Sequence, residues 1–305
     1  MTIVNESGAD TVNTSEWGVV LLAHGSQRGT TKMECSCAWL QKASPVWCHD
    51  CLSTPDGLRQ AAQKLQGALG IEQDQMVLAC LEFIEPHPDQ AVNLLSERGF
   101  ARVVVMPFLL GNGKHATLEL YEVLEKIRGQ LPELQLYLAE GFGADPTLAD
   151  LVVQRVKEVE ESSPHEHPLA EHSGNSPNGI LLVKAGTKSE YDNCEWLEEL
   201  GALVEGQLGP GYAVAVAQSH YGDPTMDDAA VKLVELRQVS SIMCVPYLFF
   251  PGMILRRNVL GGLDQIRQRY PHVSVAVTPP LGVDDRVVAV TTDRVRQAWV
   301  SNNNS

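Results

Sequence analysis

Two segments of the sequence read almost alike: Val103-Val-Val-Met-Pro-Phe-Leu-Leu110 and Ile242-Met-Cys-Val-Pro-Tyr-Leu-Phe249. Their alignment places Pro107 on Pro246, at an offset of 139 residues. The same offset aligns Pro132 with Pro271, Gly143 with Gly282, Asp145 with Asp284 and Arg155 with Arg294. Because several separate pairs share one register, we interpret the chain as one unit that occurs twice.

The offset changes along the first copy. It is 138 where Pro86 aligns with Pro224 and Glu82 with His220, and about 161 where Gly25 aligns with Gly186. The first copy therefore carries about 22 additional residues, which lie between Ser26 and Leu58.

Each copy alternates short apolar runs with helical patterns. The runs are rich in Val and Leu, as in buried parallel strands; they cover 18–23, 76–81, 102–108 and 135–139, then 179–183, 212–217, 241–246 and 273–277. Apolar residues recur at helical spacing between them, at Leu58, Ala61, Ala62, Leu65 and Leu69, at Ala91, Leu94 and Leu95, and at Leu118, Tyr121, Leu124 and Ile127. This alternation predicts an α/β fold of two similar parallel-sheet domains, related by internal duplication.

The repeats predict a domain over 17–161 and a second domain over 179–300. Residues 162–178 separate them and have the Ser, Pro, Gly and His content of a linker. Three linker histidines, His165, His167 and His172, leave weak metal collection open as an alternative.

Length and charge limit the possible functions. The 305 residues suit two ordinary domains, and the net charge of −15 disfavours a nucleic-acid partner. No apolar run reaches the ~18–20 residues that cross a bilayer, so no membrane partner is expected. Residues 1–17 lack the pattern of a secretory signal, and we expect a cytoplasmic protein whose seven cysteines are thiols or metal ligands.

Three polar residues follow predicted strands of the first copy: His24, Glu82 and His115. Ligands of open α/β sheets bind beyond the carboxyl ends of the strands, where these residues could meet. Two imidazoles and a carboxylate suit first-row divalent metals and can also exchange protons near neutral pH. Glycines at 25, 111 and 113 would admit a flat ligand close to the backbone.

The second copy lacks these imidazoles. Lys184-Ala-Gly-Thr187 has no histidine beside its glycine, and Ile254 takes the place of His115. Taken singly, His24 and His115 could be ordinary loop histidines. Their loss from one copy only is expected if the first copy performs chemistry and the second forms a wall.

Three motifs resemble a known family. They are Leu21-Leu-Ala-His-Gly-Ser26, Leu81-Glu-Phe-Ile-Glu-Pro86 and Val105-Met-Pro-Phe-Leu-Leu-Gly-Asn-Gly-Lys-His115. Together they resemble the class II tetrapyrrole chelatases, in particular the two-domain sirohydrochlorin cobaltochelatases and ferrochelatases. Val245-Pro-Tyr-Leu-Phe-Phe-Pro-Gly252 is a second copy of the family pattern, and the resemblance covers nearly all of 17–300 except the insertion.

The resemblance implies insertion of Co²⁺ or Fe²⁺ into sirohydrochlorin or a related tetrapyrrole, for cobalamin or siroheme biosynthesis. His24 would accept a pyrrole proton and contact the metal, His115 would be a second metal contact, and Glu82 would relay protons or balance charge. The carboxylates of the macrocycle would need basic residues, for which the candidates are Arg28, Lys114, Arg256 and Arg257. Each of these four could equally be a solvated surface residue.

Two other functions stay open. The chain could be a metal or tetrapyrrole carrier without turnover, or an iron–sulfur or redox sensor on the same fold. The sensor hypothesis rests on the insertion, which holds Cys35, Cys37, Cys48 and Cys51.

This cysteine spacing could bind Zn²⁺ or an iron–sulfur cluster, or the thiols could be unligated redox or metal-relay groups. Cys80, Cys194 and Cys244 fall in strand or helix patterns and are expected in the core.

Overall fold

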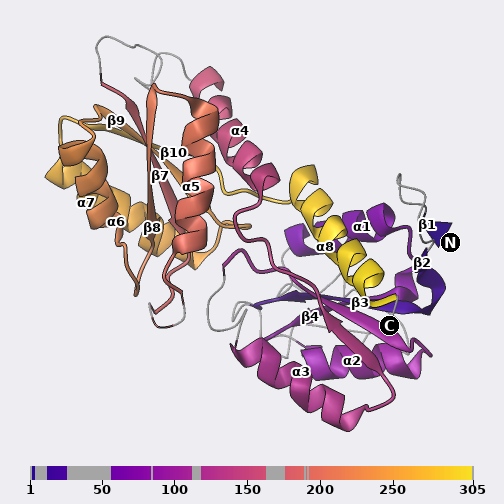
Figure 1. Cartoon of the computed structure of the whole chain (residues 1–305). Coiled ribbons are helices and arrows are strands. Elements are labelled where there is room, and N and C mark those ends of the chain that lie inside the picture. Colours follow the sequence, from indigo (N-terminus) through magenta and orange to yellow (C-terminus); the bar gives the residue numbers. More distant parts are fainter. Residues whose placement is uncertain are drawn as a thin grey trace. The chain divides into compact units, whose positions relative to one another are not determined.

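The structure is a computed structural model. It describes residues 2–3, 12–25, 56–83, 85–111, 118–162, 176–188, 190 and 192–303. The chain forms two compact units (Figure 1), and each is considered by itself. Unit 1 comprises Met1–Phe142 and Val287–Ser305, and unit 2 comprises Gly143–Arg286.

Unit 1 is built on a four-stranded parallel sheet in the order β4-β3-β5-β6. Its strands are β3 (Trp17–Ala23), β4 (Met76–Cys80), β5 (Arg102–Pro107) and β6 (Gln135–Leu138). Its helices are α1 (Asp56–Leu69), α2 (Pro88–Glu97), α3 (Leu118–Gln130) and α8 (Asp285–Asn303), and two short strands, β1 (Thr2–Ile3) and β2 (Val12–Asn13), pair antiparallel. Figure 1 shows α2 and α3 on one face of the sheet and α1 and α8 on the other.

Helices on both faces explain why the strands are apolar throughout. All seven residues of β3 are buried. Val20 and Leu22 belong to the core cluster that α2 and α3 cover. Val19 and Leu21, whose side chains point to the opposite face, are equally inaccessible.

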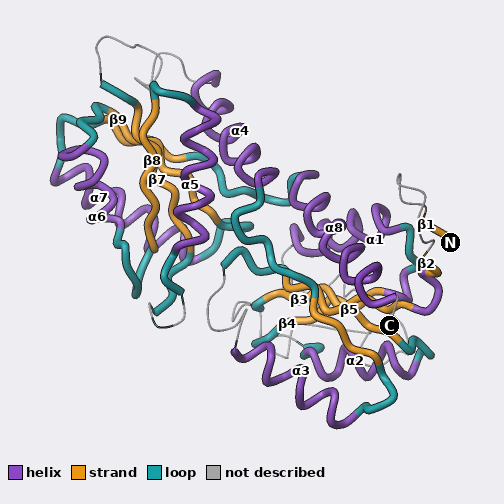
Figure 2. The backbone as a smooth tube through the Cα atoms, in the orientation of Figure 1, coloured by secondary structure: helices purple, strands orange, loops and turns teal. Residues whose placement is uncertain are grey.

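Unit 2 repeats this plan with a parallel sheet in the order β8-β7-β9-β10. Its strands are β7 (Asn178–Lys184), β8 (Tyr212–Gln218), β9 (Ser241–Tyr247) and β10 (Ser274–Val277). Its helices are α4 (Pro146–Ser162), α5 (Glu195–Leu208), α6 (Met226–Val231) and α7 (Leu260–Arg269), with π-helical segments at Lys232–Leu236 and Ile254–Val259. Figure 2 shows α5 alongside β7 and β8.

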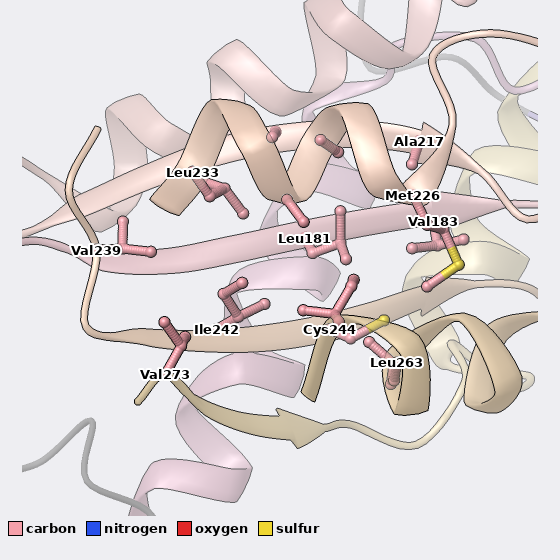
Figure 3. Packing of buried hydrophobic residues seen from close by; sticks show 14 of the residues in the cluster. Leu181, Val183, Ala217, Met226, Leu233, Val239, Ile242, Cys244, Leu263 and Val273 are labelled. Atoms are coloured by element: carbon pink, nitrogen blue, oxygen red, sulfur yellow. The ribbon is translucent and has the colours of Figure 1, made fainter. Parts of the chain in front are cut away.

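The core of unit 2 has the same alternation. Leu181 and Val183 of β7 lie with Ile242 and Cys244 of β9 in one cluster, which also includes Met226 of α6 and Leu263 of α7 (Figure 3). These β7 residues stand at the positions that Val20 and Leu22 hold in β3 at the offset of 161.

Strand register confirms the duplication residue by residue. Leu22 pairs with Pro107 in unit 1, and Val183 pairs with Pro246 in unit 2. The offsets of 161 and 139 that align the sequences therefore also align the sheets. The predicted fold class is confirmed, and each predicted strand agrees with its observed bounds to within one residue at either end.

The compact units differ from the sequence repeats in one helix each. Helix α4 ends the first repeat but packs in unit 2, where the Tyr212 hydroxyl donates to Glu160 at 2.7 Å and the Arg155 guanidinium donates to the Leu281 carbonyl at 2.9 Å. Burial and the Glu160 hydrogen bond raise the pKa of Tyr212 to about 12.

Helix α8 ends the second repeat but packs in unit 1. The ring of Trp299 lies 6.2 Å from that of Trp17, and Arg296 donates to the Ala68 carbonyl at 2.8 Å. The repeat boundaries of 17–161 and 179–300 therefore divide the chain differently from its compact units.

The buried face of α3 differs from the predicted one. Leu124 and Ile127 are buried as expected, but Leu118 and Tyr121 are exposed. Leu120 takes the third core position instead. In this helix two overlapping apolar stripes both have helical spacing, so periodicity alone does not choose between them.

Three cysteines are in the core, as predicted: Cys80, Cys194 and Cys244 are buried free thiols. Burial raises the pKa of Cys194 to about 11 and raises that of Cys244 further. Both are therefore protonated and poor metal ligands at neutral pH.

Among the described residues, no helix combines the length and the hydropathy that a bilayer-spanning segment needs.

Candidate functional site

The carboxyl edge of β3 and β4 brings His24 next to Glu82. Pairing continues one step beyond the strands, because the Leu81 N–H donates to Ala23 O and the Glu82 N–H donates to His24 O, both at 2.9 Å. Both His24 and Glu82 are half-buried. Two members of the predicted group are thus adjacent at the sheet edge where ligands of such folds bind.

Gly25 makes this approach possible. Its φ is +95°, and a Cβ built at this position would lie 1.9 Å from the carbonyl oxygen of Glu82. No other residue type fits without moving the backbone. The glycine that was predicted to let a ligand approach thus also lets the backbone at Glu82 approach closely.

The ring of His24 contacts the carbonyl of the next residue. Its Nδ1 lies 3.3 Å from the carbonyl oxygen of Gly25. A carbonyl only accepts hydrogen bonds, so this contact favours the neutral tautomer with the proton on Nδ1 and the lone pair on Nε2. Histidines that bind metals commonly hold their other ring nitrogen in this way.

Phe83 and His87 belong to the same edge, although the sequence did not single them out. Phe83 has a φ of +65°, and its ring centroid lies 6.4 Å from that of His24. His87 precedes α2, and its Nδ1 lies 3.1 Å from the Cys80 carbonyl oxygen. Phe83 lies within the Leu81–Pro86 motif, and its position next to Glu82 is the sequence feature that could have identified it.

The corresponding edge of unit 2 has the same backbone. The Ser219 N–H donates to Lys184 O at 3.0 Å, and a Cβ on Gly186 would lie 1.7 Å from His220 O. Tyr221 has a φ of +70°, like Phe83. A cis peptide precedes the proline of each turn, Pro86 and Pro224.

The side chains at this second edge are different. Ala185 replaces His24, and the ammonium of Lys184 lies among three oxygens: Asp192 Oδ2 at 2.8 Å, Gln218 Oε1 at 3.0 Å and the Ala185 carbonyl at 3.2 Å. Lys184 and Asp192 are both buried. The ammonium donates hydrogen bonds to Gln218 and Ala185 and forms an ion pair with Asp192, so this edge of unit 2 is closed by an internal ion pair.

Asp192 is itself held in place. Its Oδ1 accepts from the Cys194 N–H at 2.9 Å and from the Trp196 indole at 3.2 Å. The ion pair is therefore part of the folded core of unit 2 rather than an open binding group.

His220 occupies the position of Glu82 in unit 2. Burial and the neighbouring Lys184 ammonium lower its pKa. Its ring lies 4.5 Å from that of Tyr221, and Ser219 Oγ lies 2.7 Å from its Nδ1. The group at this edge is thus a largely neutral imidazole, where unit 1 has a carboxyl side chain.

Several predicted site residues lie outside the described residues: His115, Lys114, Arg28, Cys35, Cys37, Cys48 and Cys51. Arg256 and Arg257 are exposed on the π-helical segment after β9, in unit 2. Within the part of the chain that is described, no three His, Cys, Asp or Glu side chains are grouped to hold a metal ion. Of the three predicted catalytic residues, the structure describes His24 and Glu82, and of the predicted metal contacts it describes His24.

A model of the CbiX family matches residues 54–159 and 179–298, which is most of both repeats. The chain belongs to the CbiX family. The resemblance inferred from the motifs is thereby confirmed.

Relatives with assigned names agree with the family match. The sirohydrochlorin ferrochelatase of Priestia megaterium is 25% identical over 186 residues, which are 61% of this chain and 64% of that relative. The sirohydrochlorin cobaltochelatase of Sulfolobus acidocaldarius is 29% identical over 120 residues, which are 39% of this chain and 91% of that relative. The chain thus spans just under two thirds of the Priestia protein.

Solved structures share the fold. SirB from Bacillus subtilis with Fe³⁺ has a TM-score of 0.68 at 17% identity, covering 95% of this chain and 98% of SirB. CbiX, described as the terminal enzyme of siroheme biosynthesis in denitrifying bacteria, has a TM-score of 0.54 at 18% identity, covering 92% of this chain and 99% of that one. The likeness extends over both units.

Proposed function

We propose that the chain is a chelatase that inserts Co²⁺ or Fe²⁺ into sirohydrochlorin, with its reaction centre in unit 1. Family membership supports the reaction class, because relatives carry the names of sirohydrochlorin chelatases for both metals. The observation that carries the location is the contrast between two equivalent sheet edges. Unit 1 presents His24 beside Glu82, whereas Lys184 and Asp192 close the edge of unit 2.

Insertion exchanges one divalent metal ion for two pyrrole N–H protons. The metal loses water ligands as the four ring nitrogens bind it, and both protons must be accepted by a base or by water. His24 suits a metal contact and proton acceptor, because the hydrogen bond from its Nδ1 to Gly25 O leaves Nε2 as the acceptor nitrogen.

Glu82 is the second proton-handling group in this proposal. Its backbone N–H is hydrogen-bonded to the carbonyl of His24, so the two residues are neighbours on the same edge of the sheet. It would pass a proton from His24 to solvent or balance the charge of the incoming metal. His115 is proposed as the second metal contact.

The substrate is a polycarboxylate, and the protein has a net charge of −15. Local basic residues must therefore offset the overall repulsion. We propose Arg28, Lys114, Arg256 and Arg257 for this role, of which Arg256 and Arg257 are exposed in unit 2.

An absorbance assay with metal-free sirohydrochlorin, run with each metal in turn, tests the proposal. An enzyme converts many equivalents of tetrapyrrole, and its preferred ion gives the higher kcat/KM. Saturation at one equivalent, without turnover for any divalent metal, would instead identify a carrier and contradict the proposal.

A further inference from the structure

Phe83 combines two unfavourable properties. Its φ of +65° is a left-handed conformation that bulky residues rarely adopt. Its side chain is also 43% exposed, so burial of the ring does not account for the residue. Glycine or asparagine would suit this backbone better. Residues with strained backbone cluster at functional sites, which indicates a functional role for the phenyl ring.

The ring lies next to His24 in the candidate site. Phe83 directly follows Glu82, whose N–H is bonded to His24 O. The phenyl and imidazole centroids are 6.4 Å apart, and the two ring planes differ by 33°. A flat ligand whose centre reaches His24 would therefore extend over the exposed phenyl ring.

We propose that Phe83 is a substrate-contacting residue whose ring packs against the face of the tetrapyrrole. This inference rests on the proposed function and names a specificity determinant of the same site. The conjugated core of the macrocycle is flat and apolar, whereas its periphery carries carboxylates. An exposed phenyl ring recognises the core by offset packing and water exclusion, and leaves the carboxylates to basic residues.

The second repeat provides an internal comparison. Tyr221 has the same left-handed backbone and is 82% exposed, but its ring packs on His220, and Ala185 stands where unit 1 has His24. The turn therefore permits an aromatic residue at this position in both units. In unit 1 that residue lies beside His24, the proposed metal contact, whereas Ala185 occupies the equivalent position in unit 2, so Tyr221 is a matched control.

The conformation of Phe83 makes the test decisive. Phe83→Gly removes the ring and relieves the backbone, so the thermal midpoint should stay within a few degrees of wild type or rise. Affinity should move the other way, with a roughly five- to tenfold higher Kd for metal-free sirohydrochlorin. The loss should fall mainly on KM, since the ring contacts the macrocycle rather than the protons.

Three further variants complete the design. Phe83→Tyr keeps a ring and should restore binding. Phe83→Asn tolerates the left-handed backbone without a ring, and should bind as weakly as Phe83→Gly even if the glycine variant is unstable. Tyr221→Gly should leave the Kd unchanged. Binding is measured by quenching of protein fluorescence, and turnover by absorbance.

Wild-type Kd and KM in both Phe83→Gly and Phe83→Asn, with normal turnover, would overturn this inference alone and leave the chelatase proposal standing. An equal loss of affinity in Tyr221→Gly would overturn it as well. A wild-type protein that neither binds nor metallates sirohydrochlorin would overturn both proposals.

Discussion

The backbone N–H of Glu82 donates a hydrogen bond to the carbonyl oxygen of His24, with 2.9 Å between the two atoms. This bond extends the β3–β4 pairing past the end of the strands. It places the backbone of Glu82 beside that of His24 before any ligand binds. Such preorganisation lowers the cost of positioning a metal or a proton acceptor.

Gly25→Ala should damage this site and the fold together. The added methyl would lie 1.9 Å from Glu82 O at a φ of +95°, so His24 and Glu82 must move apart. We expect a loss of roughly 1–3 kcal/mol in the free energy of unfolding, as for other overpacked sites, and a fall in kcat. Urea denaturation and the chelation assay measure the two effects.

Gly67→Ala is the matched control. Gly67 lies in α1, and a methyl group added there would meet no atom within 4 Å, so alanine should raise stability by about 0.5–1 kcal/mol. Equal behaviour of the two alanine variants would show that the close approach at Gly25 is unimportant.

The buried ion pair of unit 2 should be a stability determinant rather than a catalytic one. Asp192→Asn leaves the Lys184 ammonium buried without its counter-charge, which costs roughly 3–5 kcal/mol. Asp264→Asn breaks an exposed pair with Arg267 and should cost less than about 1 kcal/mol. Urea midpoints test this difference. Similar small losses of stability in both variants would show that other groups than Asp192 stabilise the buried Lys184 ammonium.

The pH dependence of stability should report on His220. Its pKa is lowered in the folded protein, by burial first and then by Lys184. Below the ordinary pKa near 6.5 the unfolded chain then binds more protons than the folded one, so stability falls as the pH is lowered through this window.

His220→Gln removes the titrating imidazole. The stability of this variant should therefore fall less than that of wild type between about pH 7 and pH 5. Urea midpoints measured across this range give the comparison. Identical pH profiles for the two proteins would argue against a lowered His220 pKa.

The cysteine-rich insertion should be dispensable for the fold. Between β3 and α1 lie 32 residues, but only ten lie between β7 and α5, and the two sheets have the same strand order. Replacing Cys35, Cys37, Cys48 and Cys51 by serine should therefore leave circular dichroism and thermal unfolding nearly unchanged.

The Zn²⁺ or iron–sulfur hypothesis for these cysteines stays a prediction. Elemental analysis and visible spectra of anaerobically purified wild type and quadruple variant should differ by one Zn²⁺ or one cluster. Equal metal content in both would leave the cysteines as redox-active or incidental thiols.

Local and repeated features could be read from the sequence. Apolar runs predicted the strands because parallel strands are buried on both faces, and the common offsets predicted equivalent registers. The adjacency of His24 and Glu82 could be predicted because each follows such a run, and the topology brings the ends of these strands together.

Features that depend on tertiary packing could not be predicted from the sequence. The amphipathic pattern of α8 shows that it packs on a sheet but not on which one, so the contact of Trp299 with Trp17 was not foreseen. Likewise, Lys184 and Asp192 carry no joint sequence signal. Phe83 is unusual through its φ angle and its exposure, neither of which can be derived from residue identity.

Metallation kinetics of His24→Ala test whether unit 1 inserts the metal. We expect this variant to fold and to bind metal-free sirohydrochlorin with a Kd near that of wild type, but its kcat should fall by about 10²-fold or more, as for loss of a general base. His220→Ala, at the closed edge of unit 2, should keep wild-type kcat. Near-normal turnover by a folded His24→Ala variant would contradict the assignment of unit 1 as the site of metal insertion.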